Sequence, residues 1–345
     1  MVESSPIVCS ASWFPPVTGG MATVANELAE LFEGNGFRAV RLSYPTSKLS
    51  APNYTLQSLL TVAKSNIVHL HVASKKAALW SLPPAVAAVI LHKPFILHYH
   101  GGNANDLMNV AGGKMMLSRA AAIVTPSPAV KKQFEEKGYK PELIVNGLFT
   151  SKFPYKEKDF TVPQMLSARP LYPHYNTDVL IEATDILRQK YPATRLTIAG
   201  DGPESKRLKE KVTSLNLLGN VEFTGPVSPS KINELYANHN ILLSAVKYDN
   251  RPVSFIEAQS SGAIVIAVNA WDKEAPIKNG ITGILTQTAK PKEIADAVDR
   301  IISDNSKAAR ISIEARAESE AHDWGNIFPW WLVLYRKILD SDKRI

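Results

Sequence analysis

A loop and the start of a helix in the second half of the chain combine residue types that bind an anion and a sugar. The segment reads "YDNRPVSFIEAQSSG", residues 248–262. Pro252 at a first helical position favours a helix start whose amides, at Val253 and Ser254, point outward as an anion site. Glu257 lies about 7–8 Å further along the axis on the same face, at roughly 1.5 Å per residue. Its carboxylate can accept hydrogen bonds from two neighbouring hydroxyls, such as those of a ribose.

Asp249 lies on the loop just before this helix, and we expect it to address a group nearer the phosphate end of the same ligand. A plainer interpretation stays open. In that interpretation Asp249 is a surface loop residue, and Glu257 is a partly buried helix residue paired with a basic neighbour. The spacing alone favours the plainer interpretation.

The elements that must position these residues are short strand-like runs and amphipathic helical stretches, which alternate along the whole chain. This pattern is typical of α/β domains with largely parallel sheets. Because 345 residues exceed one typical core, we expect two doubly wound domains, at 1–155 and 156–325, with 149–163 as their linker. The last helix, 326–345, is expected to pack back on the first domain. Ligands of such sheets bind beyond the carboxyl ends of the strands, here in a cleft between the domains.

The composition favours anionic partners and excludes several protein classes. The formal net charge of +7 suits nucleotides or a membrane surface. The basic residues are scattered, however, and no nucleic-acid module is recognisable, so no nucleic-acid partner is expected. A single cysteine, Cys9, permits neither an internal disulfide nor a cysteine zinc site. With no secretory signal or membrane-spanning run, we expect a cytoplasmic protein.

The apolar segment 77–91 is the one candidate for contact with a membrane. Lys75 and Lys76 flank it, so it would suit peripheral docking on an anionic membrane surface. It is equally compatible with a buried helix, and its alanine-rich face favours that interpretation.

The segment "DNRPVSFIEAQSSGAIVIA" resembles the signature of the retaining glycosyltransferases of family four, also called group-one glycosyltransferases. That signature has two glutamates separated by seven residues; Asp249 replaces the first here, and Glu257 is the second. The resemblance covers nearly all of the chain and implies the GT-B fold, two Rossmann-like domains that face each other across a cleft. It also implies that Glu257 holds the donor ribose and that Asp249 lies near the donor sugar.

Two segments of the first half resemble family elements in the same order. "WFPPVTGGMATVANELAELF" resembles the first strand, glycine loop and helix, where Gly19 and Gly20 would let backbone approach the donor diphosphate or the acceptor. "ILHYHGG" resembles the strand that ends in a histidine facing the transferred sugar. The resemblance therefore implies a catalytic role for His100.

The phosphate-binding cations depart from the family pattern. The family commonly has an arginine and, five residues on, a lysine after the first strand of the second domain. Here "SARPLYPHYNTDV" places Arg169 one position early and Tyr175 where the lysine is usual. We expect Arg169 to keep the phosphate role and Lys247 and Arg251 to supply the missing cation. Val253, Ser254 and Glu257 complete the expected donor site.

The predicted function is transfer of a sugar from a nucleoside-diphosphate donor, UDP- or GDP-linked, to a glycan or lipid-linked acceptor, as in polysaccharide biosynthesis. The resemblance implies retention of the anomeric configuration. Helix amides and Arg169 can stabilise the departing diphosphate without a metal or other cofactor. The only Asp-x-Asp sequence, Asp340 and Asp342, lies in the polar tail.

Two alternatives stay open: a nucleotide-sugar epimerase of the same fold, and a non-catalytic sugar-nucleotide binding protein, which the Asp249 and Tyr175 departures would suit. A glycosidase is disfavoured, because Asp249 and Glu257 lie on one loop and helix and not across a groove from each other.

Four histidines alternate on two predicted strands, His69 and His71 on one and His98 and His100 on the next. Together they could form a metal cluster. Histidine pairs without a nearby cysteine or carboxylate motif usually line a cleft, so no metal site is expected.

Overall fold

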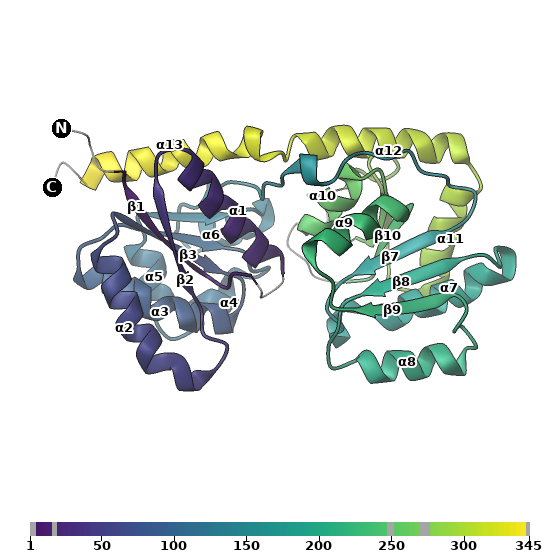
Figure 1. Ribbon diagram of the computed structural model, residues 1–345, viewed down its shortest axis with the longest axis horizontal. Helices are drawn as coiled ribbons and strands as arrows, with labels where there is room; N and C mark the ends of the chain where they lie inside the picture. The colour runs from purple at the N-terminus through teal and green to yellow at the C-terminus, as the bar shows by residue number, and fades with distance from the viewer. Residues whose placement is uncertain (1–4, 16–18, 247–251, 270–276, 343–345) are drawn as a thin grey trace. The chain divides into compact units, whose positions relative to one another are not determined.

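The computed structural model describes residues 5–15, 19–246, 252–269 and 277–342. The chain divides into two units, Met1–Gly147 with Gly325–Ile345 and Leu148–Trp324, each built around its own sheet (Figure 1). The division falls at 147, whereas the sequence analysis sets the boundary at 155. The segment 149–163, expected to be a linker, belongs to the second unit because Phe153 and Phe160 are buried, at 5% and 1% exposure.

The first unit contains a six-stranded sheet in the order β2-β1-β3-β4-β5-β6, with parallel pairing throughout. Its strands are β1 (Ile7–Ser12), β2 (Arg38–Ser43), β3 (Ile67–Val72), β4 (Phe95–Tyr99), β5 (Ala122–Thr125) and β6 (Glu142–Leu143). Every residue of β3 and β4 is buried, as expected for central strands covered on both faces. The strand order reverses at β1, which places the switch point of the sheet beside β1 and β3.

The helices of the first unit connect these strands, and one returns from the end of the chain. They are α1 (Gly20–Gly34), α2 (Ala51–Ala63), α3 (Lys75–Ile90), α4 (Ala104–Met108), α5 (Gly113–Arg119), α6 (Pro128–Glu135) and α13 (Trp324–Asp342). In Figure 1 α13, in yellow, runs beside α1 and β1. The ring of Tyr335 lies 4.2 Å from that of Phe32, centroid to centroid, and the ring of Phe328 lies 5.2 Å from it. The helix therefore completes the core of this unit.

Helix α3 is the segment for which the sequence left two interpretations. Its alanine face is buried, including Ala77, Ala78 and Ala85, while Leu79 and Ile90 are exposed. The Ser74 side chain caps its first turn by accepting a hydrogen bond from the Ala77 amide. Among the helices of the described ranges, none combines the length and apolarity that a membrane span requires.

The second unit contains another parallel six-stranded sheet, in the order β12-β11-β10-β7-β8-β9. Its strands are β7 (Gln164–Ala168), β8 (Arg195–Ala199), β9 (Val221–Gly225), β10 (Ile241–Ser244), β11 (Ile264–Val268) and β12 (Ile284–Thr286). Its helices are α7 (Thr177–Lys190), α8 (Ser205–Ser214), α9 (Pro229–Asn238), α10 (Val253–Ser260), α11 (Pro291–Ile302) and α12 (Asn305–Glu320). The α/β class with two doubly wound parallel sheets, predicted from the alternation of elements, is confirmed.

The order of the second sheet reverses at β7, which has β8 on one side and β10 on the other. Ligands of doubly wound sheets bind at such a reversal, beyond the carboxyl ends of the strands. Arg169 directly follows β7, and the chain after β10 leads to α10. The topology therefore brings two of the predicted site segments to the same edge of this sheet.

Candidate functional site

Helix α10 begins at Val253, after Pro252 in an extended conformation (φ −63°, ψ 126°). Pro252 is thus the N-cap, one residue before the first helical position expected from the sequence. Its carbonyl accepts the Phe255 amide at 3.0 Å, whereas the amides of Val253 and Ser254 are among those that a helix start leaves without a carbonyl in the preceding turn. The Ser254 hydroxyl is buried and has no hydrogen-bond partner among the described residues. The start of α10 thus offers polar hydrogens to an anion.

Glu257 is half-buried one turn into α10. The hydroxyl of Tyr236, on α9, donates a hydrogen bond to Glu257 Oε2 at 2.8 Å. Burial raises the pKa of Tyr236 well above its usual value, the neighbouring Glu257 raises it further, and Arg169 lowers it. Tyr236 is therefore a neutral donor that fixes the orientation of the carboxylate, and nothing in the local sequence pattern predicted it.

Arg169 extends from the end of β7 toward α10. Its guanidinium carbon lies 5.9 Å from the ring centroid of Phe255 and 5.7 Å from that of Tyr175. These distances are within the range of cation–π contacts. Tyr175, which occupies the usual lysine position, thus contributes a ring face beside the cation and no charge of its own.

Asn176 stabilises the same edge of the sheet. Its backbone is left-handed (φ 49°, ψ 42°), and its side-chain amide donates to the Ala245 carbonyl at 2.9 Å. Asparagine tolerates this conformation better than most residues. The bond ties the loop after β7 to the end of β10, on which α10 depends for its position.

The turn at Gly200 and Gly202 supports the backbone of the Arg169 loop. A Cβ on Gly200 would lie 2.2 Å from the Arg169 carbonyl oxygen, and one on Gly202 would lie 2.5 Å from the Leu171 oxygen. The amide of Leu171 donates to the Asp201 carbonyl at 3.0 Å. The glycines are therefore required by close packing, and this Gly-Asp-Gly segment is a structural turn.

Substituting Gly200 by alanine is expected to lower the free energy of unfolding by about 1–3 kcal/mol, because the new methyl group overpacks the Arg169 loop. The φ of 151° adds strain for any residue with a Cβ. Gly219→Ala is the matched control, since nothing lies within 4 Å of a Cβ there. Urea unfolding of both variants measures the difference, and equal stabilities would contradict the packing argument.

The remaining second-unit predictions, Lys247, Asp249 and Arg251, lie outside the residues that the structure describes. Their roles stay predictions. The described part of the expected donor site is formed by Arg169, Val253, Ser254 and Glu257, which the structure brings to one edge of the sheet.

Gly19, Gly20 and His100 belong to the first unit. Gly19 is the N-cap of α1 with a φ of 138°, and Gly20 is the first residue of that helix. His100 directly follows β4, and its amide donates to the Val72 carbonyl at 2.7 Å. Burial lowers the pKa of His100 to about 3, so its imidazole is neutral at pH 7. A neutral imidazole can donate one hydrogen bond and accept another.

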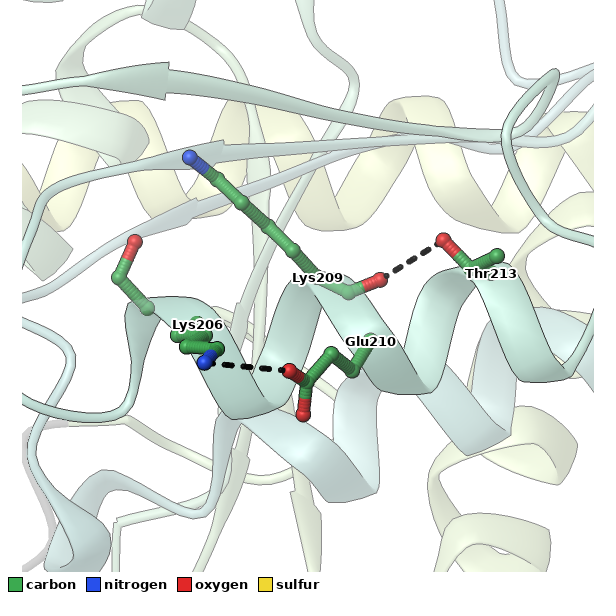
Figure 2. Close-up of a pocket in the computed structure, with 5 residues that line it drawn as sticks. Lys206, Lys209, Glu210 and Thr213 are labelled. Atoms are coloured by element: carbon green, nitrogen blue, oxygen red, sulfur yellow. Dashed lines mark hydrogen bonds and ion pairs between the residues drawn. The ribbon is translucent and has the colours of Figure 1, made fainter.

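Two surface hollows lie elsewhere on the second unit. The first, of about 500 Å³, runs along α8 and is lined by Ser205, Lys206, Lys209, Glu210 and Thr213. Figure 2 shows its ion pair between Lys206 Nζ and Glu210 Oε1, at 3.9 Å. The second, of about 660 Å³, lies at the amino ends of β7, β8 and β9 and includes Arg195 and His239. Neither contains a predicted site residue.

Comparison with protein families identifies the second unit. Residues 150–318 match the family model described as "Glycosyl transferases group 1". The chain is 26% identical over 167 residues to a D-inositol 3-phosphate glycosyltransferase of Rhodococcus opacus, an alignment that spans 46% of this chain and 37% of the relative. It is 22% identical over 185 residues to a GDP-mannose-dependent alpha-(1-6)-phosphatidylinositol monomannoside mannosyltransferase of Mycobacterium tuberculosis, spanning 52% of this chain and 46% of that protein. The chain thus matches less than half the length of these curated relatives.

Solved structures resemble the whole chain in fold. Anabaena HepE in complex with UDP and glucose has a TM-score of 0.75 at 17% identity and covers 98% of this chain and 100% of its own. Sucrose-phosphate synthase from Thermosynechococcus elongatus has a TM-score of 0.82 at 17% identity, covering 97% and 100%. These likenesses show the GT-B fold of glycosyltransferases. Residues 150–318 thus resemble group 1 glycosyl transferases in sequence, and the chain as a whole has the GT-B fold.

Proposed function

We propose that the protein transfers a sugar from a nucleoside diphosphate, UDP- or GDP-linked, to a glycan or lipid-linked acceptor, with retention of the anomeric configuration. One observation carries the proposal: Arg169, the start of α10 and Glu257 share the switch-point edge of a group 1 domain. The names of the relatives support this class of reaction, since one is GDP-mannose-dependent and HepE was crystallised with UDP-glucose.

In this proposal the diphosphate binds between Arg169 and the amides of Val253 and Ser254. Negative charge accumulates on the diphosphate as the bond to the sugar breaks, and preorganised donors lower the barrier by stabilising that charge. Glu257, oriented by the Tyr236 hydroxyl, accepts hydrogen bonds from the ribose hydroxyls. The bond between the anomeric carbon and the diphosphate oxygen breaks, a new bond forms on the same face between that carbon and the acceptor oxygen, and the proton of the acceptor hydroxyl passes to the departing diphosphate.

The other predicted residues complete the proposal. Asp249 and His100 would contact the transferred sugar, and Lys247 and Arg251 would add positive charge near the diphosphate. Gly19 and Gly20 would allow close approach of the backbone to donor or acceptor. Transfer would then proceed without a metal ion, because the cations and helix amides of this chain supply the charge that the leaving group requires.

A screen of nucleoside diphosphates and their sugars tests the proposal. The diphosphates of one nucleoside, uridine or guanosine, are expected to raise the melting temperature of the protein by about 5–10 °C at a ligand concentration near 100 times Kd. The sugar nucleotide that raises the melting temperature is then assayed as donor, with free glycans and with lipid-linked acceptors in vesicles. The vesicle assay also tests for a peripheral membrane contact. NMR of the product reports its anomeric configuration, and retention is expected. No shift with any nucleotide would overturn the proposal.

The same assays distinguish the alternatives. Conversion of the donor without an acceptor would identify an epimerase, and tight donor binding without transfer to any acceptor would identify a binding protein. Excess chelator is expected to leave the initial rate unchanged. Complete loss of transfer on immediate addition of chelator would refute the metal-independent mechanism.

A further inference from the structure

A cluster of buried histidines lies on the first sheet, in the part of the chain that the group 1 family model does not match. His69 and His71 are on β3, and His98 is on β4 directly opposite His71. The three are 1%, 0% and 1% exposed. The ring centroids of His69 and His71 are 4.1 Å apart, and the ring of His98 lies 5.3 and 5.2 Å from them. Three imidazoles thus share one apolar site.

The hydrogen bonds of this cluster are incomplete. Nδ1 of His69 is 2.6 Å from the Tyr335 hydroxyl, and Nδ1 of His71 is 3.2 Å from Nε2 of His100. Nε2 of His69 and both ring nitrogens of His98 have no partner among the described residues. Nε2 of His71 has only a long contact of 3.5 Å with the Ser10 hydroxyl. Buried polar atoms are normally satisfied, so this concentration of unsatisfied nitrogens requires an explanation.

The ring nitrogens of the three histidines suit a metal ion in spacing and in chemistry. One ring nitrogen from each of the three histidines lies within 4.8 Å of the other two. Three atoms at that spacing lie at most about 2.8 Å from a common centre, about 0.7 Å beyond a zinc–nitrogen distance of about 2.0–2.1 Å. The rings of His69 and His71 are stacked with an interplanar angle of 15°, so they would also have to rotate for their lone pairs to converge on one ion. Neutral imidazole is a common ligand of zinc-type ions.

The hydrogen bonds that are present also suit ligation. A metal-binding histidine usually donates its second N–H to a neighbouring acceptor, which fixes the ring. With Nε2 as the ligand atom, Nδ1–H of His69 would donate to the Tyr335 oxygen and Nδ1–H of His71 to His100 Nε2. Trp331 of α13 covers the cluster, with ring centroids 5.0 Å from His69 and 4.9 Å from His98.

We propose that His69, His71 and His98 bind one divalent first-row transition-metal ion of the zinc type, with water or hydroxide in the fourth position. Neutral imidazole ligands select this class of ion over magnesium and calcium, which prefer oxygen. The ion would fasten α13 to the sheet through the Tyr335 bond and so stabilise the first unit. The sequence pattern alone predicted no metal here, and this proposal departs from that prediction.

The metal site touches the proposed sugar site through the hydrogen bond between His71 and His100, and the two proposals are tested by different measurements. None of its ligands belongs to the diphosphate-binding set, and its burial implies slow release, so brief exposure to chelator would not remove the ion. Failure of the transfer proposal would therefore leave this one intact, and the reverse also holds.

Metal titration of the full chain, purified without a histidine tag and stripped by prolonged dialysis against a strong chelator, tests the site. We expect one Co²⁺ or Zn²⁺ per chain, a visible ligand-field spectrum with Co²⁺, and a higher melting temperature with either ion. His98→Phe should abolish all three effects while preserving the fold, because it replaces both unpartnered nitrogens by an apolar ring. The exposed His92→Asn, in the same unit, should behave like the unsubstituted protein.

Absence of one-to-one binding by the unsubstituted protein would overturn the proposal, as would equal binding by a folded His98→Phe variant. Should His98→Phe not fold, the Co²⁺ spectrum of the unsubstituted protein decides alone. A spectrum without nitrogen ligation would then contradict the site.

Discussion

Replacing Arg169 by alanine is expected to lower kcat roughly 100- to 1,000-fold, the usual effect of removing one preorganised donor from a developing negative charge. The guanidinium carbon lies 5.7 Å from the ring centroid of Tyr175 and 5.9 Å from that of Phe255, contacts that help to position it before the donor binds. The affinity for the nucleoside diphosphate should also fall, since the diphosphate product carries the same charge. Steady-state kinetics and calorimetric titration with the diphosphate measure the two effects.

One further variant separates charge from geometry at this position, and a second, at a distant arginine, serves as the control. Arg169→Lys should recover only part of the rate, because an ammonium group lacks the planar shape that packs on the two rings. Arg195→Ala is the matched control, an exposed arginine at the opposite end of the same sheet, and should leave kcat unchanged. If Arg169→Ala retains full activity, the diphosphate does not bind at this edge.

Glu257→Gln is expected to lower kcat/KM for the sugar nucleotide by about 10- to 150-fold. The substitution keeps the shape of the side chain and its bond with Tyr236 but replaces a charged acceptor by a neutral one. A hydrogen bond to a charged group is worth about 1.5–3 kcal/mol, which corresponds to that factor. Most of the change should appear in KM, because the ribose is bound equally in the ground state and the transition state.

The control for Glu257 is Glu234→Gln, an exposed carboxylate on α9 that pairs with Lys231. It should leave the kinetics unchanged. Tyr236→Phe should give a smaller loss than Glu257→Gln, since it removes only the group that orients the carboxylate. A Glu257→Gln enzyme with unchanged KM and kcat would show that the carboxylate does not hold the donor.

The architecture was predictable because its signals are local. Strands such as β10 (Ile241–Ser244) and β11 (Ile264–Val268) are short, fully buried runs dominated by apolar residues, of the length that a parallel sheet requires. The structure assigns the segment 149–163, which the sequence suggests is a linker, to the second unit, and the reason is not local. Its prolines and charges suggest a linker, but two separated phenylalanines anchor it to the second unit, and such anchoring has no periodic pattern.

The side chains of the site were predictable only in part. Arg169 and Glu257 have recognisable neighbours in the sequence. Tyr236 does not, because its bond joins two helices across 21 residues. For the histidines, alternation correctly predicted that each pair shares one face of its strand. The spacing could not predict which ring nitrogens lack hydrogen-bond partners, nor that Trp331 covers the cluster. Tyr335 meets His69 across 266 residues, a contact that only the tertiary fold establishes.

The return of α13 to the first sheet separates the order of synthesis from the order of assembly. The second unit is one continuous stretch of chain, whereas the first unit consists of two stretches separated by the whole of the second. The ribosome makes the six strands of the first sheet early, yet Phe328, Trp331 and Tyr335 of its core are added last. During synthesis, the whole second unit is therefore present before the first unit can complete its core. The first unit begins to be synthesised first but cannot finish folding until α13 has been synthesised.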